Sequence, residues 1–384
     1  MTQFQSSLSK ACKAMAFGAF LMTGLGSAAQ AAEDKTVYVG DMSEMTASYE
    51  DTMVHIARAH NLGFIDVKAA NPELDAWIPG AGAKITLPTM HLLPDVPHKD
   101  IVINLAEMRL YFFPRSGEKP LIYPIGIGRE GLGTPTGLTT IIRKTEGPTW
   151  RPTPRMREED PKLPAVVPPG PENPMGTHAM YLGWPQYAIH GTNKPYGIGR
   201  RVSSGCIRLY PEGITDLFPR VPNGAQVNVV NQPLKAAWIG DKLYVESHPN
   251  VDDTLILEQK GYLPPATVSE SDLAYVRKAA GIEFEKNLDL NKIKKVIEER
   301  RGYPVAVYTK GEVLNASASN SETAIEPAAA GEANTTIARD TLVLPQKNKD
   351  DHDAATVVPD QKTNILLIEK TAVVEDEEPY YRPD

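Results

Sequence analysis

The chain has 384 residues, of which 41% are hydrophobic and 23% are charged, and its formal net charge is −8. This length exceeds what one hydrophobic core usually organises, so we expect two or three domains with tails. The acidic balance argues against nucleic acid as a partner, because non-specific binding needs a large basic surface. After residue 31, no segment approaches the roughly 20 apolar residues of a transmembrane helix, so we expect no transmembrane anchor.

The first residues have the pattern of a secretory signal peptide. Lys10 and Lys13 form a basic segment, residues 14–26 are an apolar run, and Ala29-Gln30-Ala31 is a small-x-small cleavage pattern. A segment of this kind is removed on export. We therefore predict that residues 1–31 are a signal peptide and that the mature protein is secreted.

The cysteine count follows from this processing. Cys12 lies within the predicted signal peptide, so Cys206 is the only cysteine of the mature chain and no internal disulfide can form. An unpaired thiol in an exported protein is either buried and inert or used in chemistry. The count alone leaves both interpretations open.

Residues 32–44 are predicted to be a linker, and residues 45–89 a small βααβ domain. Its predicted elements are a strand at Met45–Tyr49, helices at Thr52–Asn61 and Phe64–Ala70, and a strand at Lys84–Leu87. This order, together with Asn71-Pro72 and Ile78-Pro79-Gly80, resembles a LysM module, which binds N-acetylglucosamine polymers. The sequence departs from that family at Glu50-Asp51-Thr52, where a glycine usually precedes the Asp-Thr pair. Glycan binding and a packing role as a spacer both stay open.

Residues 99–231 are predicted to be rich in β-strands. Strands are indicated by short apolar or alternating runs at Ile101–Leu105, Met108–Phe113, Leu121–Ile127, Leu138–Arg143, Ala179–Gly183, Tyr187–His190 and Val227–Val230. A proline-rich stretch from Lys144 to Gly176 shows little periodicity. Because a loop of this length inside a domain is usually functional, we expect it to form a lid or wall of the site.

Residues 232–310 are predicted to be a small α/β appendage. It comprises a hairpin at Ala236–Ile239 and Lys242–Glu246, helices at Ser271–Ala279 and Asp289–Arg300, and a closing strand at Pro304–Thr309. Residues 311–384 are rich in small, polar and acidic residues and lack a sustained hydrophobic pattern. Such a segment buries too little apolar area to offset the entropy of ordering, so we predict a disordered tail.

The residues that indicate chemistry concentrate between His190 and Leu209. Cys206 follows His190 by 16 residues, and the glycines Gly191 and Gly205 adjoin them. A thiol with its free pKa of about 8.5 is mostly protonated at neutral pH, and a neighbouring imidazole can accept its proton. The glycines permit close backbone approach and an oxyanion pocket of main-chain N–H groups.

The same stretch is locally basic. It contains Lys194, Arg200, Arg201 and Arg208 and no acidic residue. Such an excess of positive charge would lower the pKa of the thiol and favour a substrate that carries carboxylates. The alternative interpretation is a basic loop whose charge is balanced by acids elsewhere in the fold.

The stretch also resembles a family signature. His190-Gly191-Thr192, a glycine-rich gap and Ser-Ser-Gly-Cys-Ile-Arg-Leu at 203–209 are similar to the signature of the L,D-transpeptidase catalytic domain, of the YkuD type and ErfK/YbiS-like. The resemblance covers about Lys99 to Val230. It implies a mixed, β-rich fold whose catalytic domain is β-sandwich-like, between the LysM-like domain and the α/β appendage. It also implies a peptidoglycan L,D-transpeptidase of the periplasm, associated with the cell wall.

The resemblance implies a role for each residue of the motif. The cysteine matching Cys206 attacks the carbonyl of the third residue of a tetrapeptide stem, D-alanine leaves, and the acyl group passes to an amine. His190 is implied to be the base, oriented by the carbonyl of Gly191. Many members have histidine where this chain has Ser204, which leaves His190 as the candidate base. The implied oxyanion and substrate-binding residues are Gly205, Ser204, Ser203, Arg208 and Arg201.

The partners implied are peptidoglycan stem peptides and glycan strands, and the acyl acceptor stays open. A second diamino-acid stem would give a 3→3 cross-link, an envelope protein would become attached, and water would make the enzyme an L,D-carboxypeptidase. A non-catalytic peptidoglycan-binding protein is the alternative from another class. No cofactor is implied, and one cysteine with scattered histidines lacks zinc-ligand spacing. If residues 45–88 only hold glycan, removing them should hardly change turnover of a soluble tetrapeptide.

Overall fold

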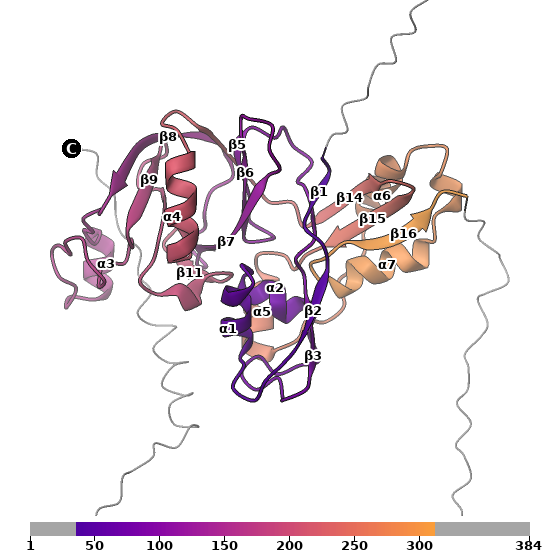
Figure 1. Cartoon of the computed structure of the whole chain (residues 1–384), viewed down its shortest axis with the longest axis horizontal. Helices are drawn as coiled ribbons and strands as arrows, with labels where there is room; N and C mark the ends of the chain where they lie inside the picture. The colour runs from indigo at the N-terminus through magenta and orange to yellow at the C-terminus, as the bar shows by residue number, and fades with distance from the viewer. Residues whose placement is uncertain (1–35, 312–384) are drawn as a thin grey trace, which may run out of the picture. The chain divides into compact units, whose positions relative to one another are not determined.

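The computed structural model describes residues 36–311 (Figure 1). The predicted signal peptide and all but the first residue of the predicted disordered tail lie outside the described residues. Within residues 36–311, no helix has both the length and the apolar character that crossing a membrane requires.

The predicted βααβ order of residues 45–89 is present. Its elements are β2 (Ser43–Thr46), α1 (Met53–Ala59), α2 (Phe64–Ala70) and β3 (Lys84–Leu87), and β2 pairs antiparallel with β3. Thr52 caps the start of helix α1, because its side chain accepts a hydrogen bond from the N–H of His55. At the start of α2, Asp66 accepts one from the N–H of Gly63 at 2.9 Å. Strands β1 (Tyr38–Val39) and β4 (His91–Leu92) pair outside this unit. Its identity as a LysM module stays a prediction.

A nine-stranded sheet forms the next part of the chain, so the prediction of a mixed, β-rich fold is confirmed. Its strands are β5 (Asp100–Asn104), β6 (Arg109–Phe113), β7 (Leu121–Gly128), β8 (Gly137–Glu146), β9 (His178–Leu182), β10 (Ala188–His190), β11 (Arg201–Ser203), β12 (Ile207–Leu209) and β13 (Gln226–Val230). Their order is β11-β7-β12-β10-β9-β8-β13-β5-β6, and β6 also pairs with β7. The sheet therefore closes on itself.

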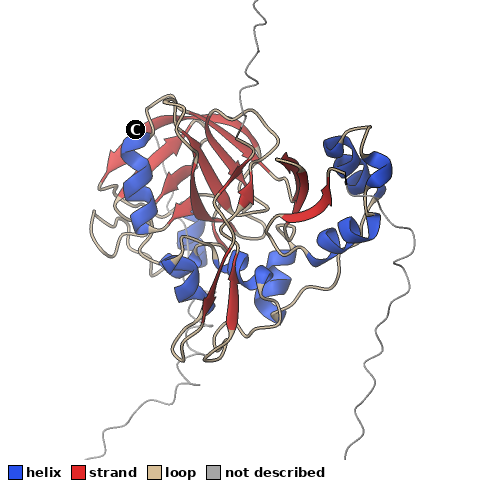
Figure 2. Cartoon of the chain, turned by 45° about the vertical axis from the view of Figure 1, so that its right-hand side comes forward, coloured by secondary structure: helices blue, strands red, loops and turns tan. Residues whose placement is uncertain are grey.

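Strand β7 makes the closure possible because it changes partners along its length. Its first half pairs with β6, with Pro124 opposite Arg109. Its second half pairs with β12 and then with β11, with Gly126 opposite Arg208. Helix α4 (Pro211–Arg220) contacts β9 and β12 on the outside of this sheet (Figure 2). The proline-rich segment contains one short helix, α3 (Pro154–Glu159).

The last described part is an α/β unit, as the sequence predicts. Strands β14 (Leu234–Ile239), β15 (Lys242–Ser247) and β16 (Val305–Thr309) form an antiparallel sheet. Helices α6 (Glu270–Ala280) and α7 (Leu290–Glu299) contact it, and α5 (Asp253–Lys260) contacts α2 instead. Two 3-10 turns, η1 (Pro195–Gly197) and η2 (Glu285–Asn287), complete the elements. Buried leucines, isoleucines and valines of β15, α6 and α7 make a separate small core.

The βααβ unit and the large sheet share one hydrophobic core. Met53, Ile56 and Phe64 belong to the same buried cluster as residues of the nine-stranded sheet. The buried carboxylate of Asp66 lies 3.0 Å from the guanidinium of Arg109 on β6. Removing residues 45–88 would expose this core and leave Arg109 without that partner, at a cost of about 3–5 kcal/mol for the ion pair alone. The structure therefore argues against a separable unit.

Candidate active site

Two neighbouring strands bring His190 and Cys206 together. Strands β10 and β12 are parallel partners, with Ile189 opposite Ile207 and His190 opposite Arg208. Cys206 is the residue immediately before β12, so its backbone lies beside the strand that ends at His190. The strand partner of His190 is Arg208, so the register brings Cys206 to within two residues of the position opposite His190.

The imidazole of His190 is fully buried. Its Nδ1 lies 2.5 Å from the carbonyl oxygen of Gly191, the contact that the resemblance implies. A carbonyl can only accept, so Nδ1 carries the proton and Nε2 keeps the lone pair that a base needs. Gly191 has no room for a side chain, because an added Cβ would lie 2.9 Å from Cγ2 of Ile214.

The turn before Cys206 is fixed by hydroxyl groups. Ser203 donates to the carbonyl of Cys206 at 2.8 Å and accepts from the N–H of Gly205 at 3.1 Å. Thr134, on the loop after β7, donates to the carbonyl of Gly205 at 2.8 Å. Since the Gly205 N–H is already engaged by Ser203, its role as an oxyanion donor stays a prediction.

Gly205 needs to be glycine in this turn. Its φ of +116° lies in a region that residues with a side chain rarely adopt, and an added Cβ would approach Tyr187 to 2.7 Å. Tyr187 therefore stands directly against the turn that carries the thiol. Burial, and then the neighbouring Cys206, raises the pKa of Tyr187.

The thiol of Cys206 is buried in an apolar cluster. The residue is 2% exposed and contacts a cluster that contains Trp150, Met156 and Met175. Its Sγ–H donates to the carbonyl of Gln186 at 3.6 Å. Because Trp150 and Met156 belong to the proline-rich segment, that segment covers the thiol, as predicted for a lid.

A cavity of about 540 Å³ adjoins the thiol. We call it the Cys206 cavity. Its lining residues come from the loop after β7, the lid, the loop before β10 and the Cys206 turn: Gly131, Leu132, Gly133, Thr153, Pro154, Arg155, Met156, Gln186, Tyr187, Ser204 and Cys206. The site is therefore an accessible cavity roofed by α3.

The cations of the basic stretch lie largely elsewhere. Arg200 stacks over the ring of Phe64 at 4.0 Å, and Arg201 donates to Asp252 at 2.9 Å. Burial raises the pKa of Glu258 on α5, while Arg200 and Arg201 act to lower it. Neither arginine lines the Cys206 cavity, so the substrate-binding role of Arg201 stays a prediction without a contact to support it. Arg208 is buried on β12 beside His190, and Ser204 lines the cavity.

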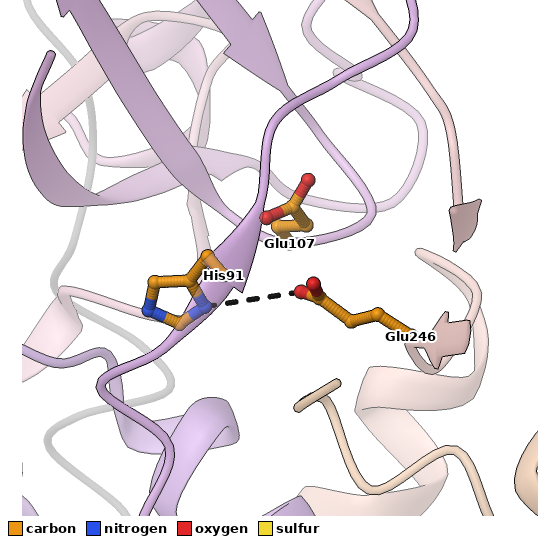
Figure 3. Close-up of side chains that lie close together, drawn as sticks. All are labelled: His91, Glu107 and Glu246. Carbon is orange, nitrogen blue, oxygen red and sulfur yellow. Dashed lines mark ion pairs between the residues drawn. The ribbon is translucent and has the colours of Figure 1, made fainter. Parts of the chain in front are cut away.

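A second cluster of charged groups lies where β4, the β5–β6 turn and β15 meet (Figure 3). We call it the Lys235 network, and it comprises the side chains of Glu107, Arg109, Lys235, Glu246 and His248, with His91 beside them. The ammonium of Lys235 is 3.0 Å from a carboxylate oxygen of both Glu107 and Glu246. Arg109 contacts Glu107 at 2.8 Å, and His248 contacts Glu246 at 2.6 Å. All five side chains are at most 2% exposed.

The electrostatics of the Lys235 network favour ionised carboxylates. Burial alone would raise the pKa of Glu107, but the charges of Lys235, His248 and Arg109 outweigh it and lower the pKa to about 2. The pKa of Glu246 is also lowered: burial would raise it, but the charge of Lys235 is the main factor that outweighs burial. His91 is different, because burial first and Arg109 second lower its pKa to about 4. The network therefore holds ionised carboxylates beside a neutral imidazole.

His91, Glu107 and Glu246 have donor atoms within 4.8 Å of one another, as a metal site would require. However, the Lys235 ammonium already lies between the two carboxylates, in hydrogen-bond range of both. A metal ion would have to displace this buried cation. We therefore interpret the cluster as an ion-pair network that joins three parts of the chain.

Comparisons with known proteins agree with the motif. The model of the L,D-transpeptidase catalytic domain (YkuD) matches residues 98–229. Probable L,D-transpeptidase YbiS of Escherichia coli strain K12 is 38% identical over 306 residues, which cover 76% of this chain and 97% of that protein. Probable L,D-transpeptidase YcfS of the same strain is 40% identical over 261 residues, 66% of this chain and 79% of that protein. The NMR structure of the catalytic domain from the E. faecium L,D-transpeptidase covers 35% of this chain and 99% of its own, with 23% identity and a TM-score of 0.28. The sequence matches show that this chain belongs to the L,D-transpeptidase family.

Proposed function

We propose that Cys206 is the nucleophile of a peptidoglycan L,D-transpeptidase and that His190 is its base. The thiol proton passes to Nε2 of His190, and Sγ attacks the carbonyl carbon of the third residue of a tetrapeptide stem. As the C–N bond to D-alanine breaks, His190 returns the proton to the leaving amine. The products of this half-reaction are a thioester on Cys206 and free D-alanine.

The second half-reaction transfers the acyl group to an amine. The amine nitrogen attacks the thioester carbonyl, His190 takes the amine proton, and the C–S bond breaks to regenerate Cys206. A lid that covers the thiol supports transfer over hydrolysis, because Trp150 and Met156 limit the access of water to the thioester. A diamino-acid stem or an envelope protein is the acceptor we propose.

The observation that carries the assignment is the parallel pairing of β10 and β12. Because His190 is the strand partner of Arg208, Cys206 comes two residues before the position opposite His190, and this supports the pair. The contact of Nδ1 with the Gly191 carbonyl supports Nε2 as the base. Without this pairing, a lone thiol would carry no functional meaning. The Cys206 cavity then gives a stem peptide access to the thiol.

The test uses the purified chain with a soluble tetrapeptide stem. We expect release of D-alanine and a mass increase of one acylated peptide, the one that contains Cys206. Muropeptide analysis of treated sacculi then identifies the acceptor: 3→3 dimers, protein-bearing muropeptides, or shortened tripeptides if water is used. Absence of D-alanine release from a folded protein would overturn the proposal and favour a non-catalytic binder.

We also propose that residues 1–31 direct export and that the LysM-like unit binds glycan strands, which places the enzyme at the cell wall. Tyr49 and Ile78 support the second point, because these large side chains of the unit are 80% and 66% exposed. Aromatic rings exposed in this way can stack on sugar faces. Tyr49→Ala should weaken sedimentation with sacculi and leave turnover of a soluble tetrapeptide unchanged. Unchanged sedimentation would remove the support for glycan binding at this position.

A further inference from the structure

One charged side chain of the lid reaches the nucleophile turn. Arg155, on α3, donates from Nη2 to the hydroxyl of Ser204 at 2.9 Å. Ser204 stands two residues before Cys206, and both line the same cavity as Arg155. Among the residues that line this cavity in the described chain, Arg155 is the only one with a permanently charged side chain. Among these lining residues, a ligand in the Cys206 cavity therefore meets a single guanidinium.

The guanidinium has donors to spare. A guanidinium carries five N–H groups in a planar fork. Within residues 36–311, Arg155 uses two of its nitrogens, one for Ser204 and one for Glu159. Its side chain is 35% exposed, so it is open in part to solvent and to a ligand. An exposed fork with free donors suits a planar anion with two oxygens.

The charge of Arg155 is only partly neutralised by its neighbours. Glu159 contacts Arg155 with one carboxylate oxygen and Arg129 with the other, at 2.9 Å for Arg129. Two guanidinium groups thus share one carboxylate, and a single carboxylate does not neutralise both. Arg129 lies on the loop after β7, so the shared carboxylate also holds α3 above the cavity.

We propose that Arg155 binds a carboxylate of the stem peptide, on a residue next to the bond that Cys206 cleaves. The proposal deepens the proposed function and rests on it, since it names the group that the donor substrate must present. The incoming carboxylate replaces the Ser204 hydroxyl as the partner of Nη2, while Glu159 keeps the guanidinium in place. Two carboxylates have this position: the C-terminal one of the leaving D-alanine, and the side-chain one of a dicarboxylic diamino acid at position three.

The first test compares three donor peptides with wild type, Arg155→Gln and Arg157→Gln. Arg157 lies on the same helix, is exposed, and makes no charged contact among the described residues, so its change removes the same charge without touching the cavity. The donors are the tetrapeptide acid, the peptide amidated at its C-terminus, and the peptide amidated at the diamino-acid side chain. The readout is kcat/KM for release of the fourth residue.

We expect Arg155→Gln to lower kcat/KM for the acid about 10- to 100-fold, the range for a hydrogen bond to a charged group. It should lower kcat/KM by less than about threefold for the amidated peptide that lacks the recognised carboxylate. The peptide that escapes the loss identifies which carboxylate Arg155 binds. Equal losses on all three donors, or an equal loss from Arg157→Gln, would overturn the proposal.

The second test is independent of transpeptidation. Iodoacetate and iodoacetamide both alkylate Cys206, forming a C–S bond and releasing iodide, but only iodoacetate carries a carboxylate. Arg155→Gln should lower the ratio of the iodoacetate rate to the iodoacetamide rate several-fold, and Arg157→Gln should leave the ratio unchanged. An unchanged ratio in Arg155→Gln would contradict the carboxylate subsite even if the chain releases D-alanine. A lowered ratio without D-alanine release would instead keep the subsite and reject the proposed function.

Discussion

The Lys235 network and the Cys206 cavity both gather charged side chains, yet the two regions use charge differently. In the network, Lys235 and Glu107 are at most 1% exposed and each contacts its opposite charge. Beside the cavity, Arg155 is 35% exposed and keeps unused donors. Buried charges are tolerated only when they are paired, so the charges of the network are engaged with one another and not exposed to a ligand. Exposure and spare donors, rather than the number of charges, distinguish a binding region from a structural one.

The largest effect on activity, with little effect on stability, should come from Cys206→Ala. We expect D-alanine release to fall by about 10⁴-fold or more, because the alanine variant has no nucleophile. His190→Ala should lower the rate of D-alanine release nearly as much, and the double variant should lower it little further, since the two residues act as one unit. The free energy of unfolding should change by less than about 1.5 kcal/mol in Cys206→Ala. The rates are measured by D-alanine release and the stability by urea unfolding; substantial turnover by the alanine variant would contradict the site.

A loss of stability with little effect on turnover should follow from Lys235→Met. This change leaves Glu107 and Glu246 buried without the ammonium that contacts both, and we expect a loss of about 3–5 kcal/mol in unfolding free energy. Lys242→Met, on the exposed side of the neighbouring strand, is the matched control and should cost less than about 0.5 kcal/mol. Turnover per folded molecule should stay close to wild type in both variants. A specific loss of turnover in folded Lys235→Met protein would place the network in the catalytic machinery.

Gly199→Ala tests the contact between the βααβ unit and the loop that leads to Cys206. Gly199 has a φ of +77°, and an added Cβ would lie 2.2 Å from the backbone nitrogen of Phe64. Gly224 has a nearly equal φ of +79° but open space around it, so Gly224→Ala isolates the conformational cost of about 1–2 kcal/mol. We expect Gly199→Ala to cost at least about 1 kcal/mol more and to lower turnover as well. Equal decreases in melting temperature for the two variants would contradict a steric cost at the contact with Phe64.

The smallest effect at neutral pH concerns His91, and it emerges only in acid. With a folded pKa of about 4 against an ordinary value of 6.5, the unfolded chain binds the proton more readily between those values. The free energy of unfolding therefore falls as pH falls through this window, by up to about 3 kcal/mol. His91→Leu should remove this contribution, and His60→Gln, at an exposed helix end, should retain it. Urea unfolding between pH 7 and 4.5 measures the slope; identical slopes in wild type and His91→Leu would contradict the assignment.

The sequence was most informative where local pattern decides structure. Alternation and turn residues predicted the hairpins at β5–β6 and β14–β15, and apolar spacing predicted α7. Helix α4 was missed because Gly213 and Pro219 obscure its helical pattern. Pro219 has no N–H to bond to the carbonyl four residues earlier, and the helix ends one residue later, at Arg220. Strands β11 and β12 have only three residues each, too few for a period to be visible.

The same limit applies to the site. Cys206 and His190 could be proposed from the sequence because both stand in one contiguous motif. Arg155 lies about fifty residues before Cys206 in a proline-rich segment, and only the folded lid brings it to Ser204. Conversely, Arg201 belongs to the motif but contacts Asp252, because α5 packs against that side. Local sequence indicates the candidate reacting groups, whereas tertiary contacts decide which cations lie near them.

The closed sheet has a consequence for when the enzyme becomes reactive. Its ring is completed only when β13, ending at Val230, pairs with β5, which begins at Asp100. Contacts between segments so far apart in sequence form slowly, because a long loop must close before they contribute. A chain still being synthesised therefore cannot complete the ring until residue 230 has emerged. The arrangement of Cys206 and His190 is therefore completed late in folding. In an incomplete chain, the sheet that holds the two residues in position is not yet stable.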